Sequence, residues 1–380
     1  MESFFVKGYV RLHEPDLLSI LDISDMELII KPTEACNFKC TFCSSTNISE
    51  DKAAKLDLDY VFQFLERFPE TRTIIVNGGD PLMMPPQYYW DIIKYLDEHN
   101  LQTTISFTTN LWPFYKNPEK WKELFKHRRM GITTSFQYGG GRLKHDLTEF
   151  SEEDFWAVSD AMLEHVGYRP DFISVITDEN EHLALENVHL AKRMGVECKL
   201  NYAMSSGPPR KFKGIIMGQE GRPYLLAKAY ELYVKIWEMG LTDHEFNTKQ
   251  MVKRLKGAGT TCPQNRECDG GIRTLQPSGD YYSCGSFGDD RVHPIDFKAE
   301  MNGPKVFPLR FQPELQSLKQ GCFTCPMFQI CNGCKKTISD LKQHSLAEAH
   351  CVKMKALAPK IIEANGLTGI LEPTEYKDES

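Results

Sequence analysis

Short apolar runs alternate with amphipathic stretches between residues 26 and 206. The apolar runs are rich in Ile, Val, Phe and Thr, which is typical of buried strands, and they cover residues 28–30, 73–76, 103–107, 131–136, 172–176 and 196–202. The stretches between them repeat apolar residues every three to four positions, which predicts helices over residues 59–68, 88–99, 120–128, 152–165 and 181–194. Parallel strands need crossover helices, so this order predicts an α/β fold with a parallel sheet. Six units rather than eight predict an open, partial (β/α)6 barrel of the TIM type.

The pattern changes after the last of these strands. Residues 222–258 read as a helical bridge, with Tyr230, Tyr233 and Trp237 forming a core stripe. Residues 259–365 hold eight of the 12 cysteines and show little periodicity, so we expect metal centres to stabilise this domain. We expect an N-terminal extension at residues 1–25, the barrel at 26–221, the bridge at 222–258, the cysteine-rich domain at 259–365 and a polar tail at 366–380.

Composition excludes several classes of protein. No apolar run approaches the roughly 18–20 residues of a membrane span, and the mixed N-terminus does not resemble a secretory signal. A net charge of −7 without a long basic tract argues against a nucleic-acid partner. Twelve cysteines without a signal peptide predict a reducing compartment, the cytoplasm, where thiols bind metals rather than form disulfides.

Three of the cysteines, Cys36, Cys40 and Cys43, share one short loop after the first predicted strand. Thiolates at this spacing can hold three corners of a cubic iron–sulfur cluster, and a missing fourth ligand leaves one iron open. The alternatives are a zinc knuckle or three unrelated thiols.

Together with Gly78-Gly79-Asp80-Pro81, about 35 residues later at the end of the next predicted strand, this loop resembles the radical SAM superfamily. The resemblance implies that the open iron binds S-adenosylmethionine. It also implies that Gly78, Gly79 and Asp80 receive the methionyl ammonium, with aspartate in place of the family's more common glutamate. Phe42 matches an aromatic position near the adenine, although core packing explains it equally well. Polar residues at later strand ends resemble ribose and carboxylate contacts or are plain caps and turns: Thr109, Asn110, Ser135, Gln137 and Asn201.

The remaining clustered cysteines resemble a SPASM extension of that superfamily, and the combined resemblance covers about 90% of the chain. Gly279 lies five residues before Cys284, as in the motif, whereas Cys331 and Cys334 are separated by two residues where the family commonly has three. The family pairing implies two auxiliary [4Fe-4S] clusters, one on Cys262, Cys268, Cys284 and Cys334, the other on Cys322, Cys325, Cys331 and Cys351. Two four-thiolate zinc sites are the alternative. Eight thiolates leave no open iron, which suits electron transfer rather than substrate binding.

The twelfth cysteine, Cys198, lies outside every motif. A lone cysteine in a strand is usually a small buried apolar residue. The alternative, catalytic interpretation is that the thiol returns a hydrogen atom to a substrate radical, as an epimerase requires.

The resemblance implies an enzyme that cleaves S-adenosylmethionine reductively and abstracts hydrogen from a substrate, giving an oxidised or crosslinked peptide. Alternatives are an epimerase or oxidoreductase acting on a small molecule, and a non-catalytic iron–sulfur electron carrier. Gly285 stands where sulfatase maturases place an aspartate, which counts against that subgroup. Only about 25 residues precede the first strand, too few for a leader-binding module, so a separate leader-peptide-binding protein is expected if the substrate is a precursor peptide. A flavodoxin- or ferredoxin-type protein is the expected electron donor.

Overall fold

The computed structural model describes residues 3–6, 26–222, 224–255, 268–306, 331, 334–364 and 371–374. The chain forms two compact units. The larger comprises Ile23–Tyr224 and Cys268–Leu309, and the smaller comprises Met1–Asp22, Leu225–Glu267 and Arg310–Ser380.

An eight-stranded sheet forms the centre of the larger unit. Its strand order is β11-β10-β2-β3-β4-β5-β6-β7, and all neighbours are parallel except β10 and β11. The strands are β2 (Glu27–Ile30), β3 (Thr73–Val76), β4 (Thr104–Thr108), β5 (Met130–Ser135), β6 (Phe172–Ile176), β7 (Cys198–Tyr202), β10 (Ile272–Leu275) and β11 (Tyr281–Tyr282). The chain order β2 to β7 equals the spatial order, and because these six strands are parallel, their carboxyl ends all lie at the same edge of the sheet.

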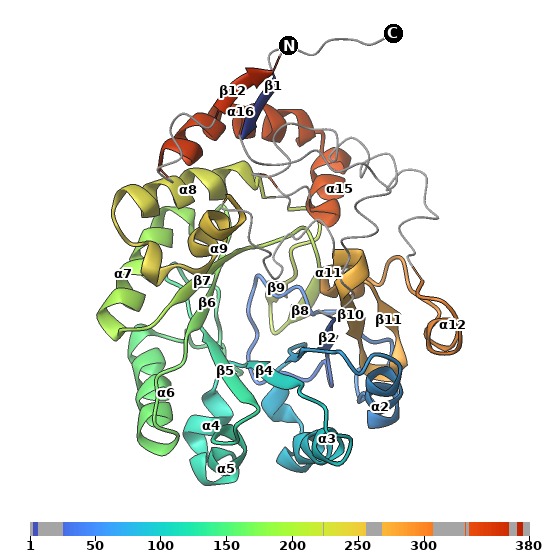
Figure 1. Ribbon diagram of the computed structural model, residues 1–380. Coiled ribbons are helices and arrows are strands. Elements are labelled where there is room, and N and C mark those ends of the chain that lie inside the picture. Colours follow the sequence, from blue (N-terminus) through green and yellow to red (C-terminus); the bar gives the residue numbers. More distant parts are fainter. Residues whose placement is uncertain are drawn as a thin grey trace. The chain divides into compact units, whose positions relative to one another are not determined.

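Helices cover the outer face of this curved sheet (Figure 1). They are α2 (Leu58–Arg67), α3 (Pro86–Glu98), α4 (Trp112–Lys116), α5 (Lys122–Phe125), α6 (Glu152–His165) and α7 (Ala184–Met194), with 3-10 turns η1 (Pro81–Met83), η2 (Pro118–Lys120) and η3 (Glu181–Leu183). Helix α6 begins at Ser151, whose side chain accepts from Asp154 N while the Asp154 carboxylate accepts from Ser151 N, a complete capping box. Helix α7 ends at Gly195 in the left-handed conformation, φ 69°.

The predicted α/β fold is confirmed, and all six predicted strands lie within two residues of an observed one. The sheet also contains β10 and β11, which the hydrophobic pattern did not predict. Strand β10 pairs in parallel with β2, with Ile272 opposite Glu27 and Leu275 opposite Ile30. The sheet therefore continues beyond the six repeated units with residues more than 240 positions away in the chain.

A buried ion pair fixes this extension, which also includes α10 (Cys268–Gly271), η5 (Pro277–Gly279), α11 (Gly285–Asp290) and α12 (Phe297–Asn302). Arg273 of β10 bonds in bidentate fashion to the Glu300 carboxylate at 2.9 and 2.7 Å, and both side chains are 0% exposed. Tyr281 donates to the same carboxylate at 2.6 Å. Three hydrogen bonds thus compensate the desolvation of the two charges.

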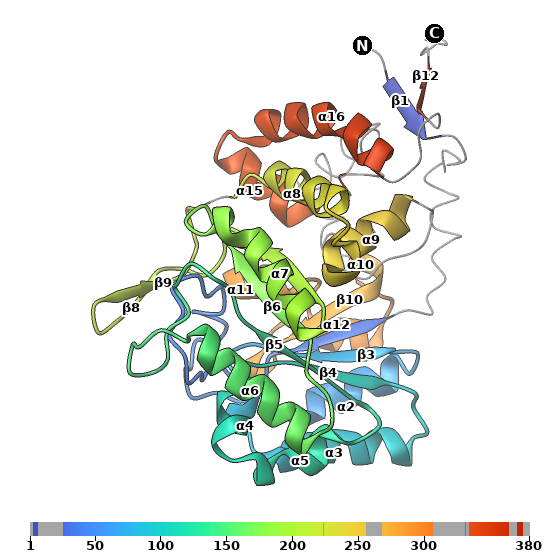
Figure 2. The ribbon, with the colours of Figure 1, turned by 90° about the vertical axis from the view of Figure 1, so that its left-hand side faces the viewer.

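The smaller unit is mainly helical. It contains α8 (Ala227–Glu238), η4 (Thr242–His244), α9 (Phe246–Leu255), α15 (Lys335–Gln343) and α16 (Ala347–Ala364), and a β1 (Ser3–Val6) and β12 (Leu371–Thr374) antiparallel pair (Figure 2). Helices α8 and α9 lie in the segment predicted to be helical. Helix α16 packs on α8, and Lys353 of α16 pairs with Glu231 of α8 at 2.9 Å. Within the described residues, no helix is both long enough and apolar enough to span a membrane.

Candidate active site

The loop with Cys36, Cys40 and Cys43 lies at the carboxyl edge of the sheet, directly after β2. Backbone hydrogen bonds hold it from two sides. Lys39 N donates to Leu143 O at 2.7 Å and Thr41 N to Gly141 O at 2.8 Å, both in the segment after β5. From the other side, Gly218 N donates to Thr41 O at 3.0 Å, just after the hairpin of β8 (Arg210–Phe212) and β9 (Ile215–Met217). The loop is therefore shaped by contacts with distant parts of the barrel.

The three thiols lie in a desolvated environment. Burial raises the pKa of Cys36 and Cys40 above the ordinary thiol value, and it raises the pKa of Cys43 to about 12. The thiols also interact electrostatically with one another, which raises the pKa of Cys36 and Cys43 further. Without a positive centre these thiols would stay protonated at neutral pH, whereas a bound metal removes the proton from a coordinating thiol.

In the described part of the chain, no three Cys, His, Asp or Glu side chains converge on a point that one metal ion could occupy. The three cysteines that hold a cubic iron–sulfur cluster each bind a different iron.

A buried arginine, which the sequence analysis missed, supplies positive charge beside the loop. Arg142 is 6% exposed, and its charge lowers the pKa of Cys40 against the effect of burial. Its guanidinium donates to Gln137 Oε1 at 3.0 and 2.7 Å and to Ser135 Oγ at 2.8 Å, and it lies 5.2 Å from the Phe42 ring centroid. Ser135, Gln137 and Phe42, predicted as cofactor contacts, are thus brought together around Arg142. The sequence feature that could have indicated Arg142 is its place directly after three glycines, in the segment that follows β5.

Gly78 and Gly79 allow the turn after β3 to approach the segment that leads into Cys36. Gly78 has φ +111°, a conformation that side chains disfavour. At Gly79 an added Cβ would lie 2.1 Å from Ala35 O. Gly79 N donates to Thr33 O at 2.9 Å, and Asp80 N donates to Ala35 O at 2.9 Å. Both glycines are required by this backbone contact, whether or not a ligand also approaches them.

The Asp80 carboxylate is buried and joins the loops after β3 and β4. It accepts from Leu82 N at 2.9 Å, from Thr109 Oγ1 at 3.0 Å to each oxygen, and from Asn110 N at 2.9 Å. Burial raises its pKa, while these hydrogen bonds act in the opposite direction. Asn110 in turn exchanges side-chain hydrogen bonds of 2.8 and 3.3 Å with Asn37 of the cysteine loop. Asp80, Thr109 and Asn110 therefore form one network that reaches the cysteine loop.

Asn201, the last predicted cofactor contact, lies in β7 and is partly exposed. It pairs in register with Val175 of β6. Cys198 begins the same strand and is 1% exposed. Because β7 runs parallel to its neighbours, Cys198 lies at the amino edge of the sheet, opposite the edge with the cysteine loop. That position favours a packing role over hydrogen-atom donation.

A second network connects the cysteine loop to helix α11. The buried ammonium of Lys31 pairs with Asp289 Oδ1 at 2.5 Å, and the hydroxyls of Ser44 and Ser45 donate to the same carboxylate at 2.9 and 3.0 Å. Lys31 also donates to Gly285 O at 3.0 Å. The helix begins after Cys284, a predicted auxiliary-cluster ligand. These contacts fix the start of α11, and therefore Cys284, relative to the serines that follow Cys43. No feature of the sequence indicated this connection.

The structure describes only some of the other predicted auxiliary-cluster ligands. Cys331, Cys334 and Cys351 belong to the smaller unit, and the backbone of Cys268 begins α10 in the larger unit. Cys262, Cys322 and Cys325 lie outside the described residues. The assignment of two auxiliary clusters stays a prediction.

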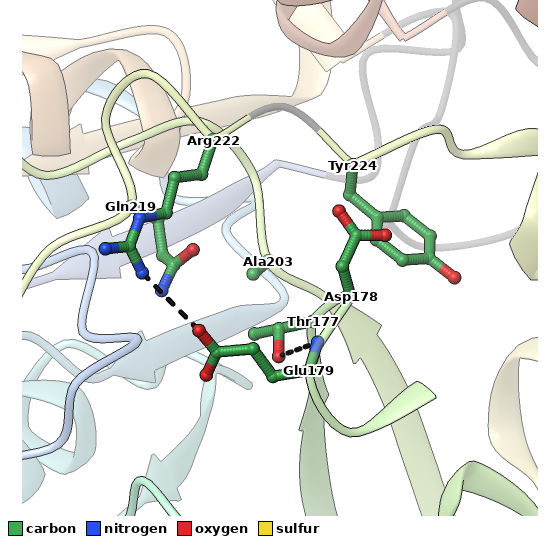
Figure 3. A pocket seen from close by; sticks show the side chains of 7 residues that line it. All are labelled: Thr177, Asp178, Glu179, Ala203, Gln219, Arg222 and Tyr224. Carbon is green, nitrogen blue, oxygen red and sulfur yellow. Dashed lines mark hydrogen bonds and ion pairs between the residues drawn. The ribbon is translucent and has the colours of Figure 1, made fainter. Parts of the chain in front are cut away.

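A small polar pocket lies at the carboxyl ends of β6 and β7. It has about 330 Å³ of empty space, partly open to solvent, and is lined by Thr177, Asp178, Glu179, Ala203, Gln219, Arg222 and Tyr224. Figure 3 shows Arg222 extended toward Glu179, with which it pairs at 3.8 Å. Gln219 N donates to Ser206 O, and its neighbour Gly218 bonds to Thr41. The wall of the pocket is thus continuous with the segment that supports the cysteine loop.

Comparisons with known proteins agree with this architecture. The sequence model of the radical SAM superfamily matches residues 30–208. Native anSMEcpe with bound AdoMet and Kp18Cys peptide is similar over 90% of this chain and 99% of that chain, at 15% identity and TM-score 0.61. Streptococcus suis SuiB bound to precursor peptide SuiA is similar over 81% of this chain and 71% of that chain, at 13% identity and TM-score 0.51. These structural likenesses show a common fold.

One curated relative aligns with part of the chain. The GTP 3′,8-cyclase of Shewanella denitrificans is 27% identical over 122 residues, which make up 29% of this chain. The alignment spans 36% of the cyclase, about a third of its length.

Proposed function

This chain is an enzyme of the radical SAM superfamily, whose sequence model covers residues 30–208, and on that basis we propose that it modifies a peptide by radical chemistry. Cys36, Cys40 and Cys43 would hold a [4Fe-4S] cluster whose open iron binds S-adenosylmethionine. When bound, the cluster supplies the electron that splits S-adenosylmethionine into methionine and a 5′-deoxyadenosyl radical, which abstracts hydrogen from the substrate. The observation that carries the proposal is the set of three half-buried thiols beside a buried arginine at the carboxyl edge of the sheet.

The protein's own residues hold charge and geometry at this site. Arg142 offsets the negative charge of three thiolates in a desolvated place, where an uncompensated charge is costly. Lys39 adds a second cation, since its ammonium donates to Cys36 O at 3.0 Å. The close approach of Gly79 to Ala35 fixes the entry of the chain into Cys36. A preorganised loop of this kind needs little rearrangement when the cofactors bind.

We assign the remaining clustered cysteines to two auxiliary [4Fe-4S] clusters with the interleaved pairing expected from the sequence. Such clusters have no open iron and would accept an electron from the substrate radical, which also loses a proton. The product therefore contains two hydrogen atoms fewer than the substrate, as in a new crosslink or a dehydrogenated bond. The place of Cys198 at the amino edge of the sheet supports this oxidative outcome over epimerisation.

A peptide is the proposed substrate because two structures with the same fold contain peptides, Kp18Cys with anSMEcpe and SuiA with SuiB. The pocket at the carboxyl ends of β6 and β7 is a suitable contact for such a chain. It presents two carboxylates, one guanidinium and the Gln219 amide, groups that can bond to backbone N–H and C=O groups. A flavodoxin- or ferredoxin-type donor and a separate leader-peptide-binding protein complete the proposed set of partners. The cysteine content supports a cytoplasmic location for the enzyme.

The test is anaerobic reconstitution with iron and sulfide, followed by dithionite and S-adenosylmethionine. We expect about twelve irons per chain and formation of 5′-deoxyadenosine. A variant with Cys36, Cys40 and Cys43 changed to alanine should lose about four irons and all 5′-deoxyadenosine, whereas the matched control Cys198→Ala should keep both. If the triple variant still forms 5′-deoxyadenosine, the loop is misassigned and the proposal fails. Stoichiometric zinc with one iron cluster would reject the auxiliary clusters alone.

Product analysis separates the two outcomes for the substrate. Oxidation predicts a loss of two hydrogens by mass spectrometry in deuterated water. A gain of one deuteron that is abolished by Cys198→Ala would show epimerisation instead.

A further inference from the structure

The hairpin of β8 and β9 presents positive charge on a protein whose net charge is −7. Lys211 and Lys213 are exposed, and neither ammonium forms an ion pair with another described residue. Ile216, in the second strand of the hairpin, is 47% exposed. Figure 2 shows the hairpin extending from the larger unit, away from the central sheet. Exposed charges of one sign around an apolar contact can steer and orient a partner of opposite charge.

The two faces of this hairpin differ. Its strands pair in register, with Lys211 opposite Ile216 and Phe212 opposite Ile215. Side chains alternate between the two faces of a strand and cross-strand pairs share a face, so Lys211 and Ile216 lie on one face and Phe212 and Ile215 on the other. The first pair is exposed, whereas the second pair is half-buried. The hairpin therefore has a cationic and apolar outer face, formed by Lys211, Ile216 and the adjacent turn.

The turn of the hairpin adds a second cation. Lys213 and Gly214 connect the strands with φ 45° and 89°. Positive φ at both central residues is typical of a type I′ turn, where Asn, Asp and Gly are preferred. The chain thus carries a lysine at a position whose backbone favours another residue. Lys213→Asn would remove the charge and suit the turn, so it separates the role of the charge from the stability of the hairpin.

The inner face of the hairpin is attached to the loop of the three cysteines. The guanidinium of Arg210 pairs at 2.6 Å with the carboxylate of Glu34, which is 2% exposed and lies two residues before Cys36. The ring centroid of Phe212 is 5.1 Å from the ammonium of Lys39 in the cysteine loop. The inner face therefore contacts the cysteine loop while the outer face remains accessible, so a molecule bound to the outer face would lie one β-ribbon away from that loop.

From this placement we propose that the outer face of the β8–β9 hairpin docks an acidic one-electron donor protein of the flavodoxin or ferredoxin type. The inference rests on the proposed function, in which each S-adenosylmethionine that is split consumes one electron. The donor loses this electron, and the cluster on Cys36, Cys40 and Cys43 gains it. Carboxylates of the donor would face Lys211 and Lys213. Charge complementarity and the attachment of the hairpin to the loop that receives the electron both favour this partner.

The binding test titrates the protein with a bacterial flavodoxin in a calorimeter. The double variant Lys211→Gln/Lys213→Asn removes two positive charges from the hairpin. Its matched control, Lys126→Gln/Lys192→Gln, removes two exposed lysines at the ends of α5 and α7 that lead to the amino edge of the sheet. At low salt we expect the hairpin variant to bind about two- to thirtyfold more weakly, as for two exposed charge pairs, and the control to bind like wild type. The difference should disappear at about 1 M salt, where the Debye length is about 3 Å.

Turnover of the reconstituted holoenzyme separates docking from chemistry. With limiting reduced flavodoxin as the electron source, we expect the hairpin variant to form 5′-deoxyadenosine more slowly than wild type. With dithionite, a small reductant that needs no docking surface, the two rates should be equal. The control variant should match wild type with both reductants.

Several results would overturn the proposal. These are no binding of flavodoxin by wild type, unchanged affinity in the hairpin variant, or an equal loss of affinity in the control. Weaker binding of a peptide of eight glutamates, with unchanged flavodoxin affinity, would assign the surface to an acidic peptide instead. An equal loss of rate with dithionite would place the effect in the active site. If wild type forms no 5′-deoxyadenosine with dithionite, the proposed function fails, and the binding measurement, which needs no turnover, still decides the docking.

Discussion

Replacement of Gly79 by alanine tests whether the turn after β3 controls the cysteine loop. The new Cβ would lie 2.1 Å from Ala35 O, 2.6 Å from Glu34 O and 2.7 Å from Ala35 C. Real Cβ contacts shorter than 3.0 Å are essentially never seen, so backbone must move. The atoms in the way belong to the two residues before Cys36, and an increase from 2.1 Å to an acceptable contact requires a displacement of about 1 Å.

The magnitude follows from the bonds that this displacement strains. Gly79 N to Thr33 O and Asp80 N to Ala35 O are both 2.9 Å hydrogen bonds, each contributing about 0.5–1.5 kcal/mol. Overpacking a close contact adds about 1–3 kcal/mol. The sum is about 2–6 kcal/mol. A unit of this size loses about 2–4 °C of thermal midpoint per kcal/mol, so we expect a fall of roughly 4–24 °C.

The assay is thermal unfolding of the protein together with its iron content after reconstitution. We expect Gly79→Ala to lower the midpoint and to lose about four irons because Cys36 is displaced. Gly131→Ala is the control, since the nearest atom to its new Cβ is Ile105 O at 4.0 Å, and it should leave both values unchanged. A Gly79→Ala protein with the wild-type midpoint and iron content would refute the reasoning.

Three further predictions concern buried charges. Asp80→Ala should lower the thermal midpoint, because the N–H groups of Leu82 and Asn110 lose their acceptor, at a cost of about 1–3 kcal/mol each. The variant should also bind S-adenosylmethionine about ten- to a hundredfold more weakly. Unchanged affinity in calorimetry would leave Asp80 with a purely structural role. Arg142→Met should reduce iron bound at the three-cysteine loop, while Arg142→Lys, which keeps the charge, should retain more; equal iron in both variants would contradict a role in charge compensation. For Glu300, burial raises the pKa but the hydrogen bond and charge of Arg273 lower it on balance, so its contribution to stability is present above the unfolded pKa and is lost as the pH falls through the folded pKa. Thermal midpoints measured from pH 7 down to about pH 3 should therefore fall more steeply in wild type than in Glu300→Gln, and parallel curves would disprove this.

The repeated strands could be predicted from the sequence because each is a short, mainly apolar run; in the structure, buried residues alternate with partly exposed ones along most of these strands. Strand β10 could not, because its sequence Ile-Arg-Thr-Leu includes an arginine that becomes fully buried only through Glu300, a partner 27 residues away. The cysteine loop itself was recognisable from spacing. Arg142 was not, since only the folded segment after β5 shows that its guanidinium lies beside Cys40. Local patterns thus predicted the elements and the thiols, whereas long-range ion pairs and hydrogen bonds determined how the site is supported.

The parallel pairing of β10 with β2 has a consequence for biosynthesis. A ribosome makes β2 through β7 before it makes β10, so β2 is an uncovered sheet edge until about 245 more residues have been added. Exposed edge strands readily pair with other chains, and contacts of such high sequence separation form slowly. The nascent barrel is therefore most prone to aggregation during this interval, and a fragment that ends before residue 268 would keep that edge permanently open.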